Sequence, residues 1–292
     1  MGESSMSVLD RRGMHVTNSR EASAPHRGGR RRRSGKRVAA VLLVTAAHAL
    51  LAGVGAARAA ASQSVPLGVD VSYPQCGAPL PSGHAFAIVG VTGGTAITTN
   101  PCLGSQLAWA AGSTGGTAHD RVQLYVNTAN PGPAAASWPR TGSNRYGICD
   151  GSVSGACSYR YGWDRAHDDA TGRGIAHPER YVWWLDVEIA NTWDYAFGGH
   201  RRNAAVLEGM TDYFHSIGVR GVGIYSTRYQ WDHVAGDGVM PDSSLNGLPN
   251  WRPAGADLAA AQATCGVAPL TRGGAVTITQ YTTDYDYNYS CI

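Results

Sequence analysis

Short apolar segments alternate with helix-like segments along residues 67–281, and this alternation restricts the chain to few folds. Apolar runs of strand length occur at residues 67–72, 86–92, 122–127, 181–188, 219–226 and 276–281. Helical patterns occur at residues 101–112, 159–172, 201–217 and 256–263, and a loop rich in Gly, Ser and Pro spans residues 130–158. Strands that alternate with helices favour a parallel α/β sheet. We therefore predict a TIM-type (β/α)8 barrel with irregular or missing helices, because the helical segments are few.

The first 59 residues have the pattern of a secretory signal peptide. A basic cluster at residues 30–37 precedes an apolar run that ends in the small-x-small pattern of Ala57, Arg58 and Ala59. That order of charged, apolar and small residues is typical of a cleaved export signal. The alternative is an uncleaved membrane anchor, since the run approaches spanning length. We predict a signal peptide at 1–59 and a single domain at 60–292, without stable membrane insertion after cleavage.

The charge of the chain resides largely in this leader. Residues 1–59 hold 11 of the 24 basic and 3 of the 21 acidic residues, which leaves 13 basic and 18 acidic residues in the remainder, a net charge of −5. An acidic domain lacks the electrostatic pattern of a nucleic-acid-binding protein. The absence of lysine after residue 59 and the richness in Ala, Gly and Arg suggest a high-GC bacterial coding bias. We expect a bacterial protein that is secreted or held in the cell wall, and the sequence does not indicate an oligomeric state.

All six cysteines follow the leader, at positions 76, 102, 149, 157, 265 and 291. An even number of cysteines in an exported chain predicts disulfides, and six allow fifteen pairings. We predict pairing of nearest neighbours: Cys76 with Cys102, Cys149 with Cys157, and Cys265 with Cys291. A metal site is the competing interpretation, but the chain has neither a CxxC pair nor clustered histidines. Nor does it contain GxSxG, HExxH, Walker or dinucleotide motifs, so no metal or cofactor is expected.

The run YVWWLDVE at residues 181–188 is the sharpest local pattern. Because side chains alternate along a strand, Trp184, Asp186 and Glu188 should share one face. Two carboxylates at the end of a buried strand need a reason, and the C-terminal rim of a barrel is where catalytic groups lie. A spacing of roughly 6–7 Å should raise the pKa of one carboxyl and leave a proton donor beside an anion. Such a pair suits acid-catalysed glycosidic cleavage.

Other acidic residues lie at the ends of the first and last predicted strands. Asp70 follows this logic in the run GVDVSYPQ at residues 68–75, and Asp284 and Asp286 follow Gln280 and Tyr281. Each could instead be an ordinary polar residue, and residues 280–289 a solvated loop. Strand ends of one barrel converge on one mouth, however, so the joint pattern predicts one site.

Several aromatic residues occur in loop-like contexts, where they could stack on sugar rings or simply pack. They are Trp138, Trp163, Trp193, Trp231, Trp251, Tyr73 and Tyr281.

The order of these motifs resembles glycoside hydrolase family 25, the barrel-fold lysozymes that cleave bacterial peptidoglycan. The resemblance runs over residues 67–292. It rests on GVDVS at 68–72, FAIVGVTGG at 86–94, WLDVE at 184–188, VGIYST at 222–227, and Gln280-Tyr281 followed by Asp286. It implies Glu188 as the general acid and Asp186 as its assistant in a retaining, substrate-assisted cleavage. It further implies that Asp70, Asp286, Gln280, Tyr281 and Tyr225 bind substrate, with Asp284 competing for the role of Asp286.

The chain departs from this pattern on two strands. Gly90 and Gly93 stand where the family has a lysine and an acidic or amide residue, and LYVNT at residues 124–128 lacks the aromatic-histidine pattern. The resemblance is therefore to a divergent secreted branch of the family. Two functions follow: a glycosidase acting on peptidoglycan or a related glycan, or a catalytically inactive glycan-binding barrel of the cell envelope.

Overall fold

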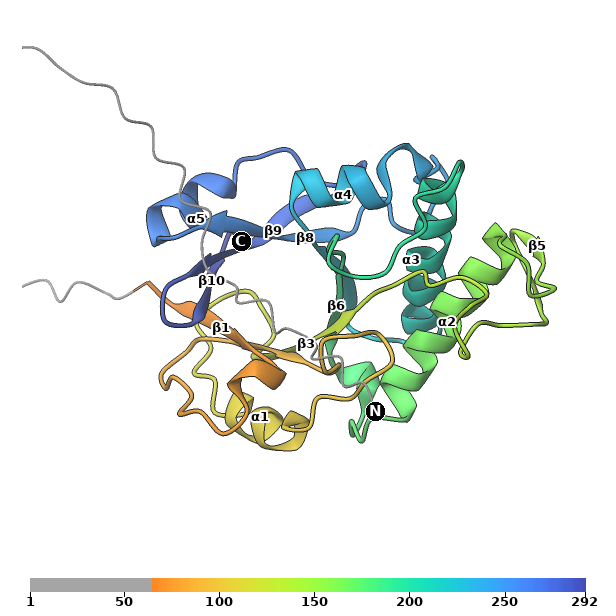
Figure 1. Ribbon diagram of the computed structural model, residues 1–292. Coiled ribbons are helices and arrows are strands. Elements are labelled where there is room, and N and C mark those ends of the chain that lie inside the picture. The colour runs from red at the N-terminus through yellow and green to blue at the C-terminus, as the bar shows by residue number, and fades with distance from the viewer. Residues whose placement is uncertain (1–64) are drawn as a thin grey trace, which may run out of the picture. The chain divides into compact units, whose positions relative to one another are not determined.

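Eight strands close into a barrel in the computed structural model, which describes residues 65–292. Around the barrel the order is β1 (Leu67–Val71), β10 (Asp286–Ser290), β9 (Ala275–Thr282), β8 (Pro249–Gly255), β7 (Gly221–Tyr225), β6 (Val182–Asp186), β3 (Val122–Asn127) and β2 (Ala87–Gly90). Figure 1 shows them as a closed ring with helices outside it. Neighbouring strands are parallel except β10, which is antiparallel to both β9 and β1. The predicted signal peptide lies outside the described residues.

Five α-helices accompany this barrel: α1 (Leu103–Ala110), α2 (Gly155–Thr171), α3 (Gly199–Ser216), α4 (Arg228–Val234) and α5 (Leu258–Thr264). A short 3-10 helix, Tyr73–Gln75, follows β1 in place of an α-helix. The prediction of a TIM-type barrel with missing helices is therefore confirmed, with one antiparallel strand added. Among residues 65–292, no helix is long and apolar enough to cross a membrane.

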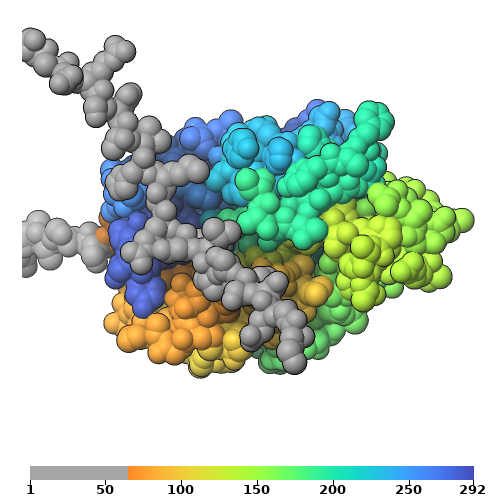
Figure 2. Space-filling model, viewed as in Figure 1, coloured from red at the N-terminus to blue at the C-terminus, as the bar shows by residue number. Residues whose placement is uncertain are grey.

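Several elements differ from the sequence-based prediction. Strands β8 and β10 and helix α4 were not predicted. The expected loop at residues 130–158 contains the hairpin of β4 (Ser143–Asn144) and β5 (Gly147–Ile148), and α2 begins within it because the Ser154 hydroxyl accepts a hydrogen bond from the Cys157 amide at 3.2 Å. This hairpin projects from the side of the barrel (Figures 1 and 2). Strand β6 ends at Asp186, so Glu188 lies two residues beyond the strand rather than within it.

Aromatic side chains fill the barrel interior. Trp184, Trp251, Phe86, Ile88 and Ile278 form a buried cluster there. A second, larger cluster packs the outside of the barrel against the helices; in it Trp183 stacks on Phe214 with ring centroids 4.5 Å apart. The predicted alternation along β6 is thereby confirmed, because Trp183 and Trp184 point to opposite faces of the strand. Because the interior of the barrel is apolar, polar side chains that could take part in a reaction are expected at the rim.

Most tryptophans that were candidates for sugar stacking are packing residues. Trp138, Trp193, Trp231 and Trp251 are buried, and Trp163 is half-buried against Tyr213. The packing interpretation is thus correct for the four buried rings, because large apolar side chains stabilise the fold most when removed from water. Only Tyr73 among the seven aromatic candidates is exposed.

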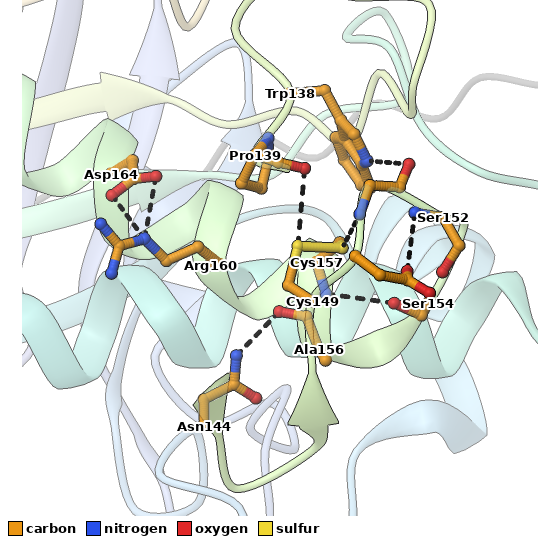
Figure 3. Close-up of a disulfide and its surroundings, with 12 residues drawn as sticks. Trp138, Pro139, Asn144, Cys149, Ser152, Ser154, Ala156, Cys157, Arg160 and Asp164 are labelled. Carbon is orange, nitrogen blue, oxygen red and sulfur yellow. Dashed lines mark hydrogen bonds and ion pairs between the residues drawn. A yellow bond between two sulfur atoms is a disulfide. The ribbon is translucent and has the colours of Figure 1, made fainter. Parts of the chain in front are cut away.

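The three predicted disulfides are all present: Cys76–Cys102, Cys149–Cys157 and Cys265–Cys291. Figure 3 shows how the second closes the loop before α2. There the Trp138 indole donates to the Gly151 carbonyl at 3.2 Å, and the Gly151 amide lies 3.3 Å from the Cys157 sulfur. The hairpin is therefore tied to α2 by a covalent bond and by local hydrogen bonds.

Removal of the Cys265–Cys291 bridge, by replacing both cysteines with serine, should lower the free energy of unfolding by about 3.5 kcal/mol. Its partners are 26 residues apart, and closing a loop of that length removes this much unfolded-chain entropy. Removal of Cys149–Cys157, whose separation is 8 residues, should lower it by about 2.5 kcal/mol. Urea unfolding measures both values; a larger loss for the shorter loop would contradict the entropic explanation.

Candidate active site

Acidic side chains from three parts of the barrel meet at the rim formed by the carboxyl ends of the parallel strands. Asp70 is near the end of β1, Asp186 ends β6, and Glu188 follows it. Asp286 begins β10, and because β10 runs antiparallel its start lies at the same rim, where it pairs with Asp70 in register. We call these residues the four site carboxylates: Asp70, Asp186, Glu188 and Asp286.

Two tyrosines at this rim have raised pKa values, and the causes of these shifts indicate that the site carboxylates lie close together. Burial, and then the negative charges of all four site carboxylates, raise the pKa of Tyr225 well above its ordinary value of 10.0. Burial likewise raises the pKa of Tyr125, with further increases from the site carboxylates other than Glu188. Coulombic effects of this kind require the charges to lie close to the hydroxyl. The predicted residues from β1, β6, β7 and β10 are thus brought together around Tyr225.

Asp186 is buried and oriented by the neighbouring strand. Its Oδ2 accepts a hydrogen bond of 2.5 Å from the Asn127 amide at the end of β3. Asn127 is itself fixed by Thr92, whose hydroxyl donates to Asn127 Oδ1 at 2.9 Å and accepts from the Asn127 backbone amide at 2.9 Å. The Thr128 hydroxyl holds the Asp186 carbonyl at 2.7 Å. This relay fixes the position of the Asp186 carboxylate before any ligand binds.

Glu188 is half-buried, and the peptide bond that follows it is held by two hydrogen bonds. The Trp193 indole donates to the Glu188 carbonyl at 2.8 Å, and the next amide, of Ile189, donates to the side-chain oxygen of Gln230 in α4 at 2.8 Å. A glutamate outside a strand would otherwise be mobile. These two hydrogen bonds fix the peptide unit between Glu188 and Ile189 at the rim, two residues beyond the Asp186 that ends β6.

Asp70 belongs to a buried hydrogen-bonded network. Its Oδ2 accepts from Gln280 Nε2 at 2.9 Å and from Asn288 Nδ2 at 2.7 Å. The Tyr225 hydroxyl in turn donates to Gln280 Oε1 at 2.8 Å, and the Trp251 indole donates to Asn288 Oδ1 at 2.7 Å. The two amide donors lower the pKa of Asp70, but burial and then the charge of Asp286 outweigh them and hold this pKa well above 3.8. Asp70 therefore retains its proton more readily than a free carboxyl does.

This raised pKa makes a prediction for stability. The folded protein binds the Asp70 proton more tightly than the unfolded chain, so stability is lost as the pH rises from about 3.8 through the folded-state pKa. Asp70→Asn cannot ionise. Its free energy of unfolding relative to wild type should therefore increase over that pH range. Urea unfolding at a series of pH values measures this difference.

Asp286→Asn serves as the second variant in this experiment. It removes the neighbouring charge that helps to raise the pKa of Asp70, so the folded-state pKa of Asp70 should lie closer to 3.8 in this variant. The stability of Asp286→Asn should therefore fall over a narrower pH range than that of wild type. If the difference in free energy of unfolding between Asp70→Asn and wild type stayed constant with pH, the burial of an ionisable Asp70 would be contradicted.

The two departures from the family pattern that the sequence shows, at Gly90 of β2 and in the segment 124–128 at the end of β3, lie next to each other. A Cβ on Gly90 would lie 2.6 Å from the Ser72 Cβ and 2.7 Å from the Tyr125 ring, so no larger side chain fits there. Tyr125 of β3 occupies the space above Gly90, and its hydroxyl lies near Ser72 and the site carboxylates other than Glu188. A neutral hydroxyl thus fills the position that a second-strand cation would need.

Two predicted site residues lie apart from the four site carboxylates. Asp284 is exposed in the turn between β9 and β10, where it accepts a hydrogen bond from Thr283 that lowers the pKa of its carboxyl. Asp286, rather than Asp284, faces Asp70. Tyr281 points to the face of β9 opposite Gln280 and stacks on Tyr287 at 5.6 Å.

Sequence reasoning missed the amide residues Asn127 and Asn288. Asn288 lies two residues after Asp286 in β10, and Asn127 lies two residues after Tyr125 in β3. Side chains two residues apart in a strand share a face, so this spacing could have indicated both asparagines. Within residues 65–292 no group of three or more His, Cys, Asp or Glu side chains is arranged to hold a metal ion.

Comparison with known proteins gives likeness to solved structures alone, since no family model and no curated protein matches the chain. A muramidase from Acremonium alcalophilum is 19% identical, with a TM-score of 0.48 over 77% of this chain and 92% of its own. The bacterial lysozyme from Streptomyces coelicolor is 17% identical, with a TM-score of 0.47 over 78% and 93%. A family 25 glycosyl hydrolase from Bacillus anthracis is 15% identical, with a TM-score of 0.46 over 77% and 88%. At such values these likenesses carry no information on activity.

Proposed function

We propose that this protein is a secreted, muramidase-like glycosidase that hydrolyses the glycan strands of bacterial peptidoglycan. The observation that carries the proposal is the convergence of four carboxylates around Tyr225 at the rim of a barrel. Paired carboxylates with different environments are what glycosidic cleavage requires. The sequence resemblance to glycoside hydrolase family 25 and the predicted export signal support the substrate and its location outside the cell.

Glu188 is the proposed general acid. It is half-buried at the rim, so it can reach a bound glycan, and its backbone is anchored by Trp193 and Gln230. A carboxylic acid in that position can protonate the oxygen of the leaving sugar as the glycosidic bond breaks.

Asp186 is the proposed partner that stabilises developing positive charge. Its carboxylate is fixed by Asn127 and Thr92, and a preoriented anion stabilises a cationic transition state without reorganising. In a substrate-assisted reaction the same carboxylate would orient the acetamido group of the reacting sugar. Asp70 and Asp286 lie opposite each other on neighbouring strands, and burial and then the charge of Asp286 raise the pKa of Asp70, so a protonated Asp70 beside an Asp286 carboxylate can hydrogen-bond sugar hydroxyls.

The second candidate function is a glycan-binding barrel without catalysis. Gly90 and Tyr125 favour it, because a hydroxyl replaces the cation of the family pattern at the rim. The two functions differ in turnover. Purified protein incubated with purified peptidoglycan should release soluble fragments and new reducing ends if it is a glycosidase. Retention of the protein on the polymer with no increase in reducing ends would instead support the binding function.

A further inference from the structure

Exposed aromatic side chains gather on the same side of the barrel as the four site carboxylates. Within residues 65–292, the large aromatic side chains that are exposed are Tyr73, Tyr195, Phe197 and Tyr229. Tyr73 follows β1, Tyr195 and Phe197 lie between β6 and α3, and Tyr229 follows β7 at the start of α4. Segments that directly follow parallel barrel strands lie at the carboxyl rim. Exposed rings that gather into a contiguous patch on one face indicate a candidate binding surface.

Three of the rings in this region form a continuous surface. His233 lies between two tyrosines: its ring centroid is 4.9 Å from that of Tyr195 and 6.0 Å from that of Tyr229. Tyr229 and His233 are four residues apart in α4, so they share one face of the helix, and their rings are parallel to within 7°. Tyr195 is 51% and Tyr229 is 68% exposed. We call Tyr195, His233 and Tyr229 the aromatic platform.

The platform is joined to the backbone at Glu188 from both sides. Gln230, adjacent to Tyr229 in α4, accepts a hydrogen bond from the Ile189 amide at 2.8 Å. Trp193, two residues before Tyr195, donates to the Glu188 carbonyl at 2.8 Å. The Ser226 hydroxyl at the end of β7 donates to the Val187 carbonyl at 2.7 Å. The segments that hold the platform are therefore the ones that position the proposed acid.

The chemistry of the platform matches that of an amino-sugar chain. A pyranose ring has apolar C–H faces and a polar edge, and an exposed tyrosine or histidine offers a flat ring with a polar atom at its edge. The two tyrosine rings lie on either side of the His233 ring, so the three rings form a row. A row of rings with polar edges on one side would follow successive sugars of an extended chain.

We propose that the aromatic platform binds the sugar residues of a peptidoglycan glycan strand that extend beyond the bond held at Glu188. This inference rests on the proposed function for the identity of the polymer. It makes the enzyme selective for long glycan strands over short fragments, because additional rings contribute binding only when the strand reaches Tyr195 and Tyr229.

The test measures binding of the Glu188→Gln protein to purified peptidoglycan sacculi by co-sedimentation, so that turnover does not remove the ligand. Addition of Tyr195→Ala and Tyr229→Ala together should weaken binding about tenfold, the loss expected from roughly 1.4 kcal/mol. The Tyr195→Phe and Tyr229→Phe pair retains both rings and should keep most of the binding. Ile148→Ala removes another exposed apolar side chain, on the β5 hairpin, and should bind like the parent.

A second ligand, a soluble tetramer of β-1,4-linked N-acetylglucosamine, tests selectivity for length. The double alanine variant should lose less affinity for the tetramer than for sacculi. The proposal for the aromatic platform would be overturned if the double alanine variant bound sacculi as tightly as the Glu188→Gln parent does. It would also be overturned if the parent did not bind sacculi. Failure of the wild type to release reducing ends, together with weakened binding by the double alanine variant, would overturn the proposed catalysis and leave the platform standing.

Discussion

Glu188→Gln is expected to lower the rate of peptidoglycan hydrolysis roughly 10²–10⁴-fold, the range for loss of a general acid. Glutamine has nearly the same shape, but it has no acidic proton to give to the leaving sugar. The backbone of residue 188 is held by Trp193 and Gln230, so the substitution should leave the fold and glycan binding intact. Initial rates of reducing-end release at several substrate concentrations separate kcat from KM.

Glu179→Gln is the matched control for this prediction. The Glu179 side chain is 44% exposed in the 3-10 helix Pro178–Arg180, which precedes β6 and therefore lies at the opposite end of that strand from Glu188. The control makes the same chemical change with no access to the rim, and its rate should equal that of wild type. A Glu188→Gln enzyme with the activity of the Glu179→Gln enzyme would show that another group supplies the proton.

Gly209→Val is expected to destabilise the fold by about 3 kcal/mol or more, because it overpacks a helix crossing. A Cβ on Gly209 of α3 would overlap the Tyr159 carbonyl oxygen and lie 2.9 Å from the Trp163 amide, both backbone atoms of α2. Gly162 of α2 meets the Val206 carbonyl of α3 in the same way. Backbone atoms cannot rotate aside, so the helices must separate. The melting temperature should fall by about 6–12 °C.

Gly104→Ala provides the comparison. Gly104 lies in α1, and a Cβ built there meets nothing within 4 Å. Alanine should stabilise this helix by about 0.5–1 kcal/mol, because glycine loses more conformational freedom on folding. Thermal unfolding of both variants distinguishes an effect of the helix crossing from a general intolerance of glycine replacement. Equal melting temperatures for Gly209→Val and Gly104→Ala would contradict the close approach of α2 and α3.

The parallel part of the barrel could be predicted from the sequence because its strands are apolar on both faces. Strand β3 was predicted with its observed bounds, and the disulfide pairs followed from proximity in sequence. Strand β10 could not be predicted in this way. Its inward side chains are Asp286 and Asn288, which bond Thr282 and Asp70 instead of filling an apolar core, so no apolar pattern marks it. Strand β8 was obscured by Pro249 and Pro253.

The charged residues of the site could be predicted from the sequence, but the residues that hydrogen-bond to them could not. Asp70 and Asp186 stand out because buried carboxylates need a reason, whereas an asparagine such as Asn127 has many ordinary roles in a strand. Only the register of β3 against β6, which places Asn127 beside Asp186, reveals the hydrogen bond between them. The exposed rings were not among the aromatic candidates, for a related reason. Those candidates were mostly tryptophans, which could stack on sugars or simply pack; four of them are buried, whereas smaller rings such as Tyr195 remain exposed.

If the carboxylates at the rim cleave the glycan strand, the new chain end must have a defined chemical identity. Purified protein is incubated with purified peptidoglycan, the products are reduced with borohydride, and the reduced ends are identified by mass spectrometry. We expect fragments that end in muramitol, produced by wild type and by Glu179→Gln but not by Glu188→Gln. Absence of new reduced ends with wild type, on peptidoglycan that a known lysozyme digests, would contradict this cleavage.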